Sequence, residues 1–538
     1  MKHSLNQVAQ TYQIKTGLIN PPVILTRVAS KEQVKNFINH KRPQILLFNL
    51  DKDLNVLNFG SLDHFITLCK NQFILALETE DIQISKTFVK KMNTLGIIDF
   101  FIISKDIELI KKSREVNGFL RSILKVEDVD SFIKSNNHFP FNIWIPSLNV
   151  DKPLIEKLQT KTLTVFTEAM TNIELKTAIL SGINGIVTTE PLNIIKHYES
   201  FKSLTHIREV QFISHRGLHL GYEHSVGPEN SLESAKHAYH SGANIIEIDI
   251  HLSRDHEVIV IHDEKTHRVS REKYYIAKTT YQQLKDVKLN KLNKHTKSRI
   301  YSLSEFLSHF KDENVRFLIE TKPISKKLIK QTLKVIKDLN MEDRVSFISF
   351  SIKNISWQND LSKFRSGYLF KPVKEDTLPF LLGLINNQNT TFNPFYKGLT
   401  KEIVTQFFHR AIPLWPWTVD AFDDLVETYH LGVNGITTNQ FDTIKDEPLI
   451  LSVETTTTFR GSPIVIKPTL TSLSGLEKHT KGKLYLIDDG GTGIEFKNMS
   501  ITGALKSGTA LFYMLVRLEF GKTTFYKTSP LIKVLVTL

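Results

Sequence analysis

Side chains that can carry out acid–base or metal chemistry stand at the ends of three short apolar segments in the middle of the chain. The segments are Val210–Ser214, Asn244–Ile250 and Val258–Ile261, and the side chains are His215 with Arg216, Glu247 with Asp249, and His262 with Asp263. Apolar runs of this length are typical of buried β-strands. The sequence therefore predicts a group of strands whose tips carry imidazoles and carboxylates.

The paired acids are the most informative of these side chains. Successive side chains of a strand point to opposite faces, so Glu247 and Asp249 share one face while Ile248 points to the other. Two carboxylates so close together repel unless a cation lies between them, and oxygen ligands suit Mg²⁺ or Ca²⁺. On its own, the pair is equally consistent with a strand that faces solvent.

A later segment supplies a third carboxylate and a fixed positive charge. Arg316–Lys322 has the sequence RFLIETK, in which Glu320 and Lys322 fall on one face of an apolar strand. The third acid would complete a metal site, and the lysine would attract an anion.

Two histidines at separate strand ends could form an acid–base pair. His215 and His262 lie 47 positions apart (262 − 215 = 47). Imidazoles titrate near neutral pH, so one can accept a proton while the other donates one. A single histidine of this kind is more often an ordinary surface or packed residue, and the joint placement at strand ends favours catalysis.

Together these residues resemble the motifs of the glycerophosphodiester phosphodiesterase family in order and spacing. The motifs are His215-Arg216-Gly217, Pro228-Glu229-Asn230, Glu247-x-Asp249, His262-Asp263, Glu320-x-Lys322 and Trp417-Thr418-Val419. The resemblance spans about Val210 to Pro448, the length of one TIM barrel. It implies a (β/α)₈ barrel that hydrolyses phosphodiesters with a divalent metal.

Residue roles follow from the same resemblance. It implies His215 and His262 as acid and base, Glu247, Asp249 and Glu320 as metal ligands, Arg216 and Lys322 as phosphate contacts, and Trp417 as a wall of the substrate pocket. Asn439 stands where the family often has an acid.

Composition narrows the remaining possibilities. A length of 538 residues favours several domains, and 41% hydrophobic with 23% charged residues is typical of globular protein. A formal net charge of +13 favours anionic partners such as phosphoesters, a cell-wall polymer or a membrane surface, while a motif for nucleic-acid binding is lacking.

The single cysteine, Cys69, excludes an intrachain disulfide. The sequence as written shows neither a signal peptide nor an apolar run long enough to span a membrane, which predicts a cytoplasmic protein or a mature surface form.

Residues 1–205 predict a second, non-catalytic barrel. Apolar runs alternate with helical stretches there, and PQILLFNL from Pro43 matches ANIIEIDI from Ala243 at an offset of 200. In this pairing Leu47 and Asn49 replace Glu247 and Asp249, and Glu78 alone remains as an acid, opposite Glu320. We expect a degenerate barrel without activity, preceded by a poorly ordered arm of about twenty residues.

The last segment, residues 448–538, changes character to short strands separated by Gly, Pro, Asp and Ser turns, which predicts an immunoglobulin-like β-sandwich. The expected fold is thus α/β, with a degenerate (β/α)₈ barrel (1–205), a catalytic TIM barrel (206–447) and this sandwich. The expected function is metal-dependent hydrolysis of glycerophosphodiesters to glycerol phosphate and an alcohol. The alternatives are a cyclising phospholipase D-type lyase acting on lysolipids, and an anionic-polymer binding protein with a relic site.

Overall fold

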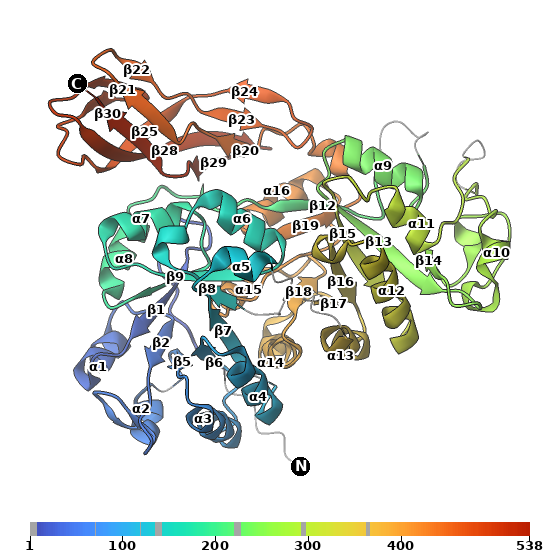
Figure 1. The fold of residues 1–538 in the computed structure, drawn as a ribbon, viewed down its shortest axis with the longest axis horizontal. Coiled ribbons are helices and arrows are strands. Elements are labelled where there is room, and N and C mark those ends of the chain that lie inside the picture. Colours follow the sequence, from blue (N-terminus) through green and yellow to red (C-terminus); the bar gives the residue numbers. More distant parts are fainter. Residues whose placement is uncertain are drawn as a thin grey trace.

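The computed structural model describes residues 8–69, 71–118, 120–134, 142–219, 227–291, 297–361 and 366–537. Two α/β units lie side by side, and a group of β-sheets packs along one flank of them (Figure 1). Within the described residues, none of the helices combines the length and the apolar character that crossing a lipid bilayer requires.

The first unit is a closed parallel barrel with the strand order β1-β10-β9-β8-β7-β6-β5-β2. Its strands are β1 (Val23–Arg27), β2 (Ile45–Phe48), β5 (Ile74–Glu78), β6 (Phe100–Ser104), β7 (Arg121–Lys125), β8 (Asn142–Trp144), β9 (Thr164–Glu168) and β10 (Gly185–Thr188). The helices around them are α1 (Lys31–Asn39), α2 (Leu62–Cys69), α3 (Ile82–Thr94), α4 (Ile107–Val116), α5 (Val129–Lys134), α6 (Lys152–Thr160), α7 (Asn172–Leu180) and α8 (Pro191–Glu199). A small hairpin, β3 (Asn55–Val56) with β4 (Gly60–Ser61), and a 3₁₀ turn, η1 (Ser147–Asn149), lie in its loops.

The barrel strands read as continuous apolar runs because both of their faces are buried. In β2, Ile45 and Leu47 belong to the apolar cluster inside the barrel, whereas Leu46 and Phe48 belong to the cluster beneath the helices. Aspartates cap the starts of α3, α4 and α6: the side chain of Asp81, for example, accepts from the backbone amides at the start of α3.

The second unit holds an eight-stranded sheet with the order β18-β17-β16-β15-β13-β12-β19, in which β14 pairs antiparallel with β13. Its strands are β12 (Gln211–Ser214), β13 (Ile245–Leu252), β14 (Val258–Val260), β15 (Arg316–Thr321), β16 (Val345–Ser349), β17 (Ser366–Phe370), β18 (Thr391–Pro394) and β19 (Gly435–Thr438). Its helices are α9 (Leu232–His240), α10 (Tyr281–Leu284), α11 (Leu303–Ser308), α12 (Lys326–Asp338), α13 (Ile352–Leu361), α14 (Leu378–Gln388), α15 (Lys401–Phe408) and α16 (Phe422–His430). Short 3₁₀ turns are η2 (Thr266–Arg268), η3 (Ile276–Lys278), η4 (Glu342–Arg344), η5 (Glu375–Thr377) and η6 (Phe441–Thr443).

Residues 414–417 bridge the gap between β18 and β19. The Trp415 amide donates to the Phe392 carbonyl at 2.9 Å, and the Thr437 amide donates to the Pro416 carbonyl at 3.0 Å. Proline lacks an amide hydrogen, so Pro413 and Pro416 prevent a regular ladder here although the segment occupies a strand position. These bonds join the two edges of the second sheet, which is the α/β barrel architecture that the sequence predicted.

The C-terminal part is built from mostly antiparallel sheets, in which the β11–β29 and β21–β30 pairs are parallel. The largest has the order β11-β29-β28-β30-β21 with β25 paired to β28, and two three-stranded sheets have the orders β20-β23-β24 and β22-β27-β26. The strands are β11 (Thr205–His206), β20 (Ile450–Ser452), β21 (Thr456–Phe459), β22 (Ile464–Val465), β23 (Thr469–Thr471), β24 (Glu477–His479), β25 (Gly482–Asp488), β26 (Glu495–Lys497), β27 (Ser500–Gly503), β28 (Gly508–Phe520), β29 (Thr523–Thr528) and β30 (Ile532–Val536). The connection between the two α/β units contributes β11 to this sheet, a pairing that the sequence did not indicate. The immunoglobulin-like arrangement remains a prediction.

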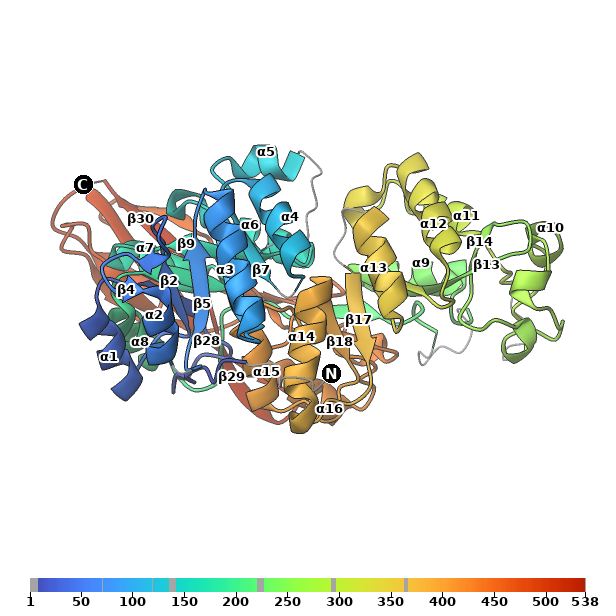
Figure 2. The same ribbon diagram turned by 90° about the horizontal axis from the view of Figure 1, so that it is seen from below.

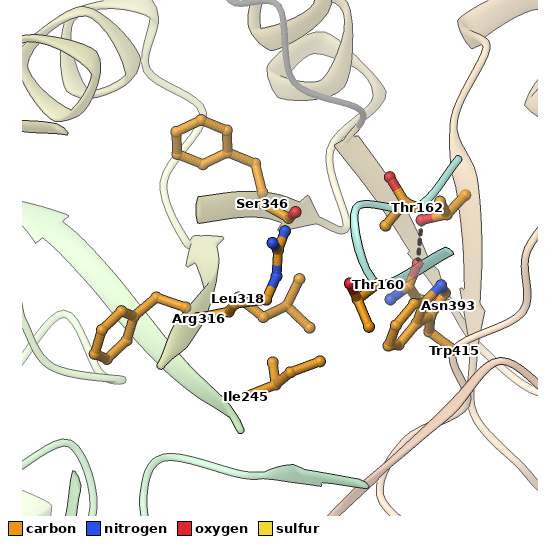
Figure 3. Close-up of a pocket in the computed structure, with 11 residues that line it drawn as sticks. Thr160, Thr162, Ile245, Arg316, Leu318, Ser346, Asn393 and Trp415 are labelled. Atoms are coloured by element: carbon orange, nitrogen blue, oxygen red, sulfur yellow. Dashed lines mark hydrogen bonds between the residues drawn. The ribbon is translucent and has the colours of Figure 1, made fainter. Parts of the chain in front are cut away.

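The two α/β units meet through the amino ends of their strands. Thr160 and Thr162 of the first unit face Ile245 and Arg316, which begin β13 and β15, across a small cavity (Figure 3). In the opposite direction, Ala411 of the second unit joins the apolar cluster inside the first barrel. Because the amino ends are used for this contact, the carboxyl ends of both sets of strands are left for other roles.

A buried ion-pair network ties the same interface together. Arg410, fully buried, donates to Asp99 at 2.6 Å, and Arg121 also pairs with Asp99. The Ala9 amide donates to Asp99 at 2.9 Å, so the N-terminal arm is part of the interface between the two units. The expectation of a poorly ordered arm is therefore wrong for residues 8–20, since buried side chains such as Ile14 hold that segment between the units.

Candidate active site

The structure brings the predicted site residues together at the carboxyl ends of the strands in the second unit. His215 follows β12, Glu247 and Asp249 lie within β13, His262 follows β14, and Glu320 lies near the end of β15. The register places Asp249 directly beside Glu320 across the β13–β15 pair. Alternation along two neighbouring strands therefore produces the cluster that the sequence predicted.

Three carboxylates form the centre of the site. One oxygen from each of Glu247, Asp249 and Glu320 lies within 4.8 Å of the others, and all three residues are buried. Glu247 Oε1 is buried without a hydrogen-bond partner among the described residues. Asn230 fixes the cluster by donating to Asp249 Oδ2 at 2.8 Å and by accepting from the Asp249 amide at 2.9 Å. A buried, all-oxygen donor set with an unpaired atom fits Mg²⁺ or Ca²⁺.

Electrostatics also favour added positive charge in this cluster. Burial and the neighbouring Asp249 raise the pKa of Glu247 well above its usual value. Burial and Asp249 likewise raise the pKa of Glu320 to about 7. Burial would raise the pKa of Asp249 too, but Lys322 and Arg216 outweigh it and lower that pKa. Lys322 and Arg216 thus stabilise the charged form of Asp249. A further cation would stabilise the charged forms of the two glutamates.

The two cations expected to contact phosphate lie within the carboxylate cluster. Lys322 Nζ is 3.0 Å from Asp249 Oδ1 and 2.8 Å from Glu320 Oε2. Arg216 Nε is 3.2 Å from Asp249 Oδ2, and its Nη1 is 3.1 Å from Glu229 Oε1. Both cations therefore lie next to the carboxylates that would bind the metal ion. Their contact with a phosphate group stays a prediction.

The backbone at Arg216 is held in an unusual conformation. Arg216 has φ +56° and Gly217 has φ +78°, so two successive residues adopt left-handed geometry. A β-carbon at Gly217 would lie 2.5 Å from Ser234 Oγ, which requires glycine there. The turn directs the Arg216 amide to Glu247 Oε2 at 3.0 Å, so the strain serves the site.

His215 is oriented by a chain of hydrogen bonds that the sequence did not reveal. Its Nδ1 lies 2.7 Å from Asn439 Oδ1, and Asn439 Nδ2 donates to Asp420 Oδ2 at 2.8 Å. Since the carboxylate of Asp420 accepts from the amide nitrogen, Asn439 must present its oxygen to His215, which places the imidazole proton on Nδ1. Nε2 is then an acceptor, 3.8 Å from Glu247 Oε2. Burial, helped by Arg216, lowers the pKa of His215 to about 4.

His262 has a different environment. Its Nδ1 is 2.6 Å from Asp263 Oδ1, and Arg268 Nε donates to Asp263 Oδ2 at 2.5 Å. Arg268 also makes a bidentate pair with Glu229, at 2.7 and 2.6 Å, and Glu229 pairs with Arg216. Burial lowers the pKa of His262, while Asp249 and Asp263 oppose the shift.

This network gives specific roles to residues that the sequence left without any. Glu229 and Arg268 connect His262 to Arg216, and the signal for Glu229 was its place in Pro228-Glu229-Asn230. Asp420 directly follows the Trp417-Thr418-Val419 motif, but nothing in the sequence pairs it with Asn439.

Aromatic side chains stand on the strand ends on the other side of the site. Trp417 Nε1 donates to the Asn393 carbonyl at 2.7 Å, and its ring meets Phe350 edge-on at 5.4 Å and Phe395 at 5.6 Å. Phe350 is 47% exposed. The arrangement can form an apolar wall, and the role of Trp417 in substrate binding stays a prediction.

Comparison with known proteins shows what the second unit is similar to. Residues 215–443 match the model of the glycerophosphoryl diester phosphodiesterase family. The range begins at His215 and contains every site residue described above. Residues 215–443 are a domain of this family.

The chain is similar to several named proteins over part of its length. A glycerophosphodiester phosphodiesterase of Caldanaerobacter subterraneus subsp. tengcongensis is 28% identical over 244 residues, covering 43% of this chain and 95% of that protein. A lysophospholipase D of Homo sapiens is 28% identical over 314 residues, covering 50% of this chain and 95% of that protein. Among solved structures, an Oleispira antarctica phosphodiesterase in complex with sn-glycerol-3-phosphate has a TM-score of 0.39 and 19% identity, covering 43% of this chain and 92% of that one.

Proposed function

We propose that this chain hydrolyses glycerophosphodiesters to glycerol phosphate and an alcohol at the site in the family domain. The observation that carries the proposal is the convergence of three buried carboxylates, two cations and two differently held histidines on one strand edge. Glu247, Asp249 and Glu320 would hold a divalent cation, Mg²⁺ or Ca²⁺. Bound there, the cation would neutralise phosphate oxygens and orient the attacking hydroxyl.

The two histidines have separate roles in this proposal. Neutral His215 takes the proton of the attacking water at Nε2, because Asn439 keeps the other nitrogen protonated. His262, whose charged form Asp263 stabilises, gives a proton to the leaving oxygen as the phosphorus–oxygen bond breaks. Arg216 and Lys322 stabilise the charge on the phosphoryl oxygens in the transition state.

The first barrel has a structural role in this proposal and does not share the chemistry. Its surviving acid, Glu78, pairs with Arg27 and with Lys125 at 2.6 Å, and Asn49 donates to the Glu78 carbonyl. Arg27 also pairs with Glu168 at 3.4 Å, and carboxylates already neutralised by cations are a poor metal ligand set. Contact through the amino ends of the strands also leaves this cluster outside the site of the second unit. We propose a degenerate copy of the same barrel, with the C-terminal sheets as a packing or anchoring module.

A lyase acting on lysolipids is a second candidate. Phe350, exposed beside Trp417, offers an apolar rim for an acyl chain, and the human relative is named a lysophospholipase D. In that reaction the attacking hydroxyl belongs to the glycerol of the substrate and the product is a cyclic phosphate. A binding protein with a relic site would not be expected to keep both histidines and all three acids.

Product analysis tests these candidates directly. With a short-chain glycerophosphodiester and added Mg²⁺ or Ca²⁺, phosphorus NMR should show glycerol phosphate as the product. A stable cyclic phosphate would favour the lyase. Lack of turnover with both metals, on diesters with and without an acyl chain, would contradict an enzymatic role.

A further inference from the structure

The active site continues into a cleft of about 800 Å³ on the side of His262. His262 and Lys322, which belong to the proposed site, form its inner end. The cleft then runs between the loop that follows β13, the segment after His262 and the start of α12. Figures 1 and 2 place this region, with α10 and β14, at the end of the molecule away from the first barrel. Only the second unit therefore shapes it.

Cations and imidazoles dominate the outer part of the cleft. Arg254, Lys265 and Lys327 line it together with His256 and His267, while its acids are Asp263 and Glu264. Asp263 is already paired with Arg268 and His262, and Glu264 Oε1 is 3.9 Å from Lys265 Nζ. The lining therefore carries an excess of positive charge that these acids do not balance.

Two local features of the cleft would favour a bound anion. Lys327 Nζ lies 2.6 Å from His256 Nε2, so an ammonium group is directed to an imidazole and not to a carboxylate. The first turn of α12 contains Lys326 and Lys327 and no acid, although the start of a helix carries partial positive charge and favours anions. An anion in the cleft would give Lys327 a charged partner and would be favoured by the start of α12.

We propose that this cleft binds a second anionic group, a phosphate carried by the alcohol side of the scissile diester. The inference rests on the proposed function, in which His262 protonates the leaving alcohol, so the cleft beside His262 receives that alcohol. A substrate with a further phosphate there is favoured over one with an uncharged alcohol and strongly over one with a quaternary ammonium group. Arg254 and Lys327 are specificity-determining residues for this second phosphate.

Two sources share this chemistry, a chain of glycerol phosphates and a phosphorylated inositol headgroup. The test compares kcat/KM for a glycerol phosphate oligomer, glycerophosphoinositol phosphate, glycerophosphoglycerol and glycerophosphocholine in the metal-loaded full chain. Both phosphorylated substrates should exceed glycerophosphoglycerol by about tenfold at low salt, and the advantage should shrink as ionic strength rises. The larger of the two values identifies the source.

A matched pair of variants separates local binding from overall charge. Arg254→Gln with Lys327→Gln should raise KM for the phosphorylated substrates by about tenfold and leave kcat and the values for glycerophosphoglycerol unchanged. Lys330→Gln with Lys334→Gln removes the same charge from exposed positions further along α12 and should change nothing.

The outcomes distinguish this inference from the proposed function. Equal losses for all four substrates, equal effects of the two variant pairs, or a wild-type preference for glycerophosphocholine would overturn the second-phosphate site while leaving the phosphodiesterase in place. Failure of the wild-type chain to cleave any of the four diesters would instead contradict the proposed function.

Discussion

Changing the leaving group should separate the roles of the two histidines. A pKa of about 4 for His215 means that roughly one molecule in 10³ carries a protonated His215 at pH 7. The free energy of protonating this imidazole at pH 7 is about 4 kcal/mol. His215 is therefore suited to accept a proton. The pKa of His262 is lowered as well, so its role as donor rests on its contact with Asp263 Oδ1 at 2.6 Å, which stabilises the charged imidazole. General acids and bases each contribute roughly 10²–10⁴-fold, so His215→Ala and His262→Ala should each lose activity of that order on an alkyl diester.

The assay repeats these measurements with a p-nitrophenyl ester of glycerol phosphate, whose leaving group needs no proton. His262→Ala should then recover most of its lost kcat, whereas His215→Ala should remain impaired. Asn439→Leu serves as a milder probe, because it removes the acceptor that orients His215 and should behave like a weakened His215→Ala with both substrates. Rescue of His215→Ala in place of His262→Ala would show that the roles are reversed.

Three further predictions concern the rest of the chain. Glu78→Gln should leave turnover unchanged while Glu320→Gln abolishes it, and equal losses in steady-state assays would mean that the two α/β units share a site. Asp99→Asn leaves Arg410 and Arg121 buried without their carboxylate, so denaturant unfolding should show a loss of about 3–5 kcal/mol, and a loss below 1 kcal/mol would refute the interface role. Burial, with Arg410, lowers the pKa of His409 to about 3 in the folded chain, so its neutral form contributes stability that is complete above about pH 6.5 and is lost as pH falls towards 3. The loss is at most about 1.4 kcal/mol per pH unit, and a His409→Gln variant whose acid unfolding is as steep as that of the wild type would contradict this origin.

The centre of the site was predictable because it depends on short-range geometry. Alternation along one strand places Glu247 beside Asp249, and parallel neighbours bring Glu320 to the same edge, so the motifs alone predicted the carboxylate cluster. The apolar runs that begin and end each motif likewise predicted the strands.

The missed features all depend on contacts between distant segments. His215 and Asn439 are 224 positions apart, and their hydrogen bond exists only because the last strand of the sheet pairs with the first. Asn439 departs from the family pattern. Its amide nitrogen nevertheless donates to Asp420, and this bond fixes the amide oxygen as the acceptor for His215. The N-terminal arm was misjudged for the same reason, since its few apolar residues gain order from Asp99 and the seam between two units.

The central claim is that a divalent cation held by Glu247, Asp249 and Glu320 is required for cleavage of glycerophosphodiesters. The most direct test measures turnover and metal binding together, by calorimetry with Mg²⁺ and Ca²⁺ on chelator-treated wild-type protein and on a Glu247→Gln variant. We expect turnover to stop after chelation, to return with added metal in proportion to occupancy of one site, and to be lost with metal affinity in the variant. Undiminished turnover after exhaustive chelation, or full metal affinity in Glu247→Gln, would contradict the account.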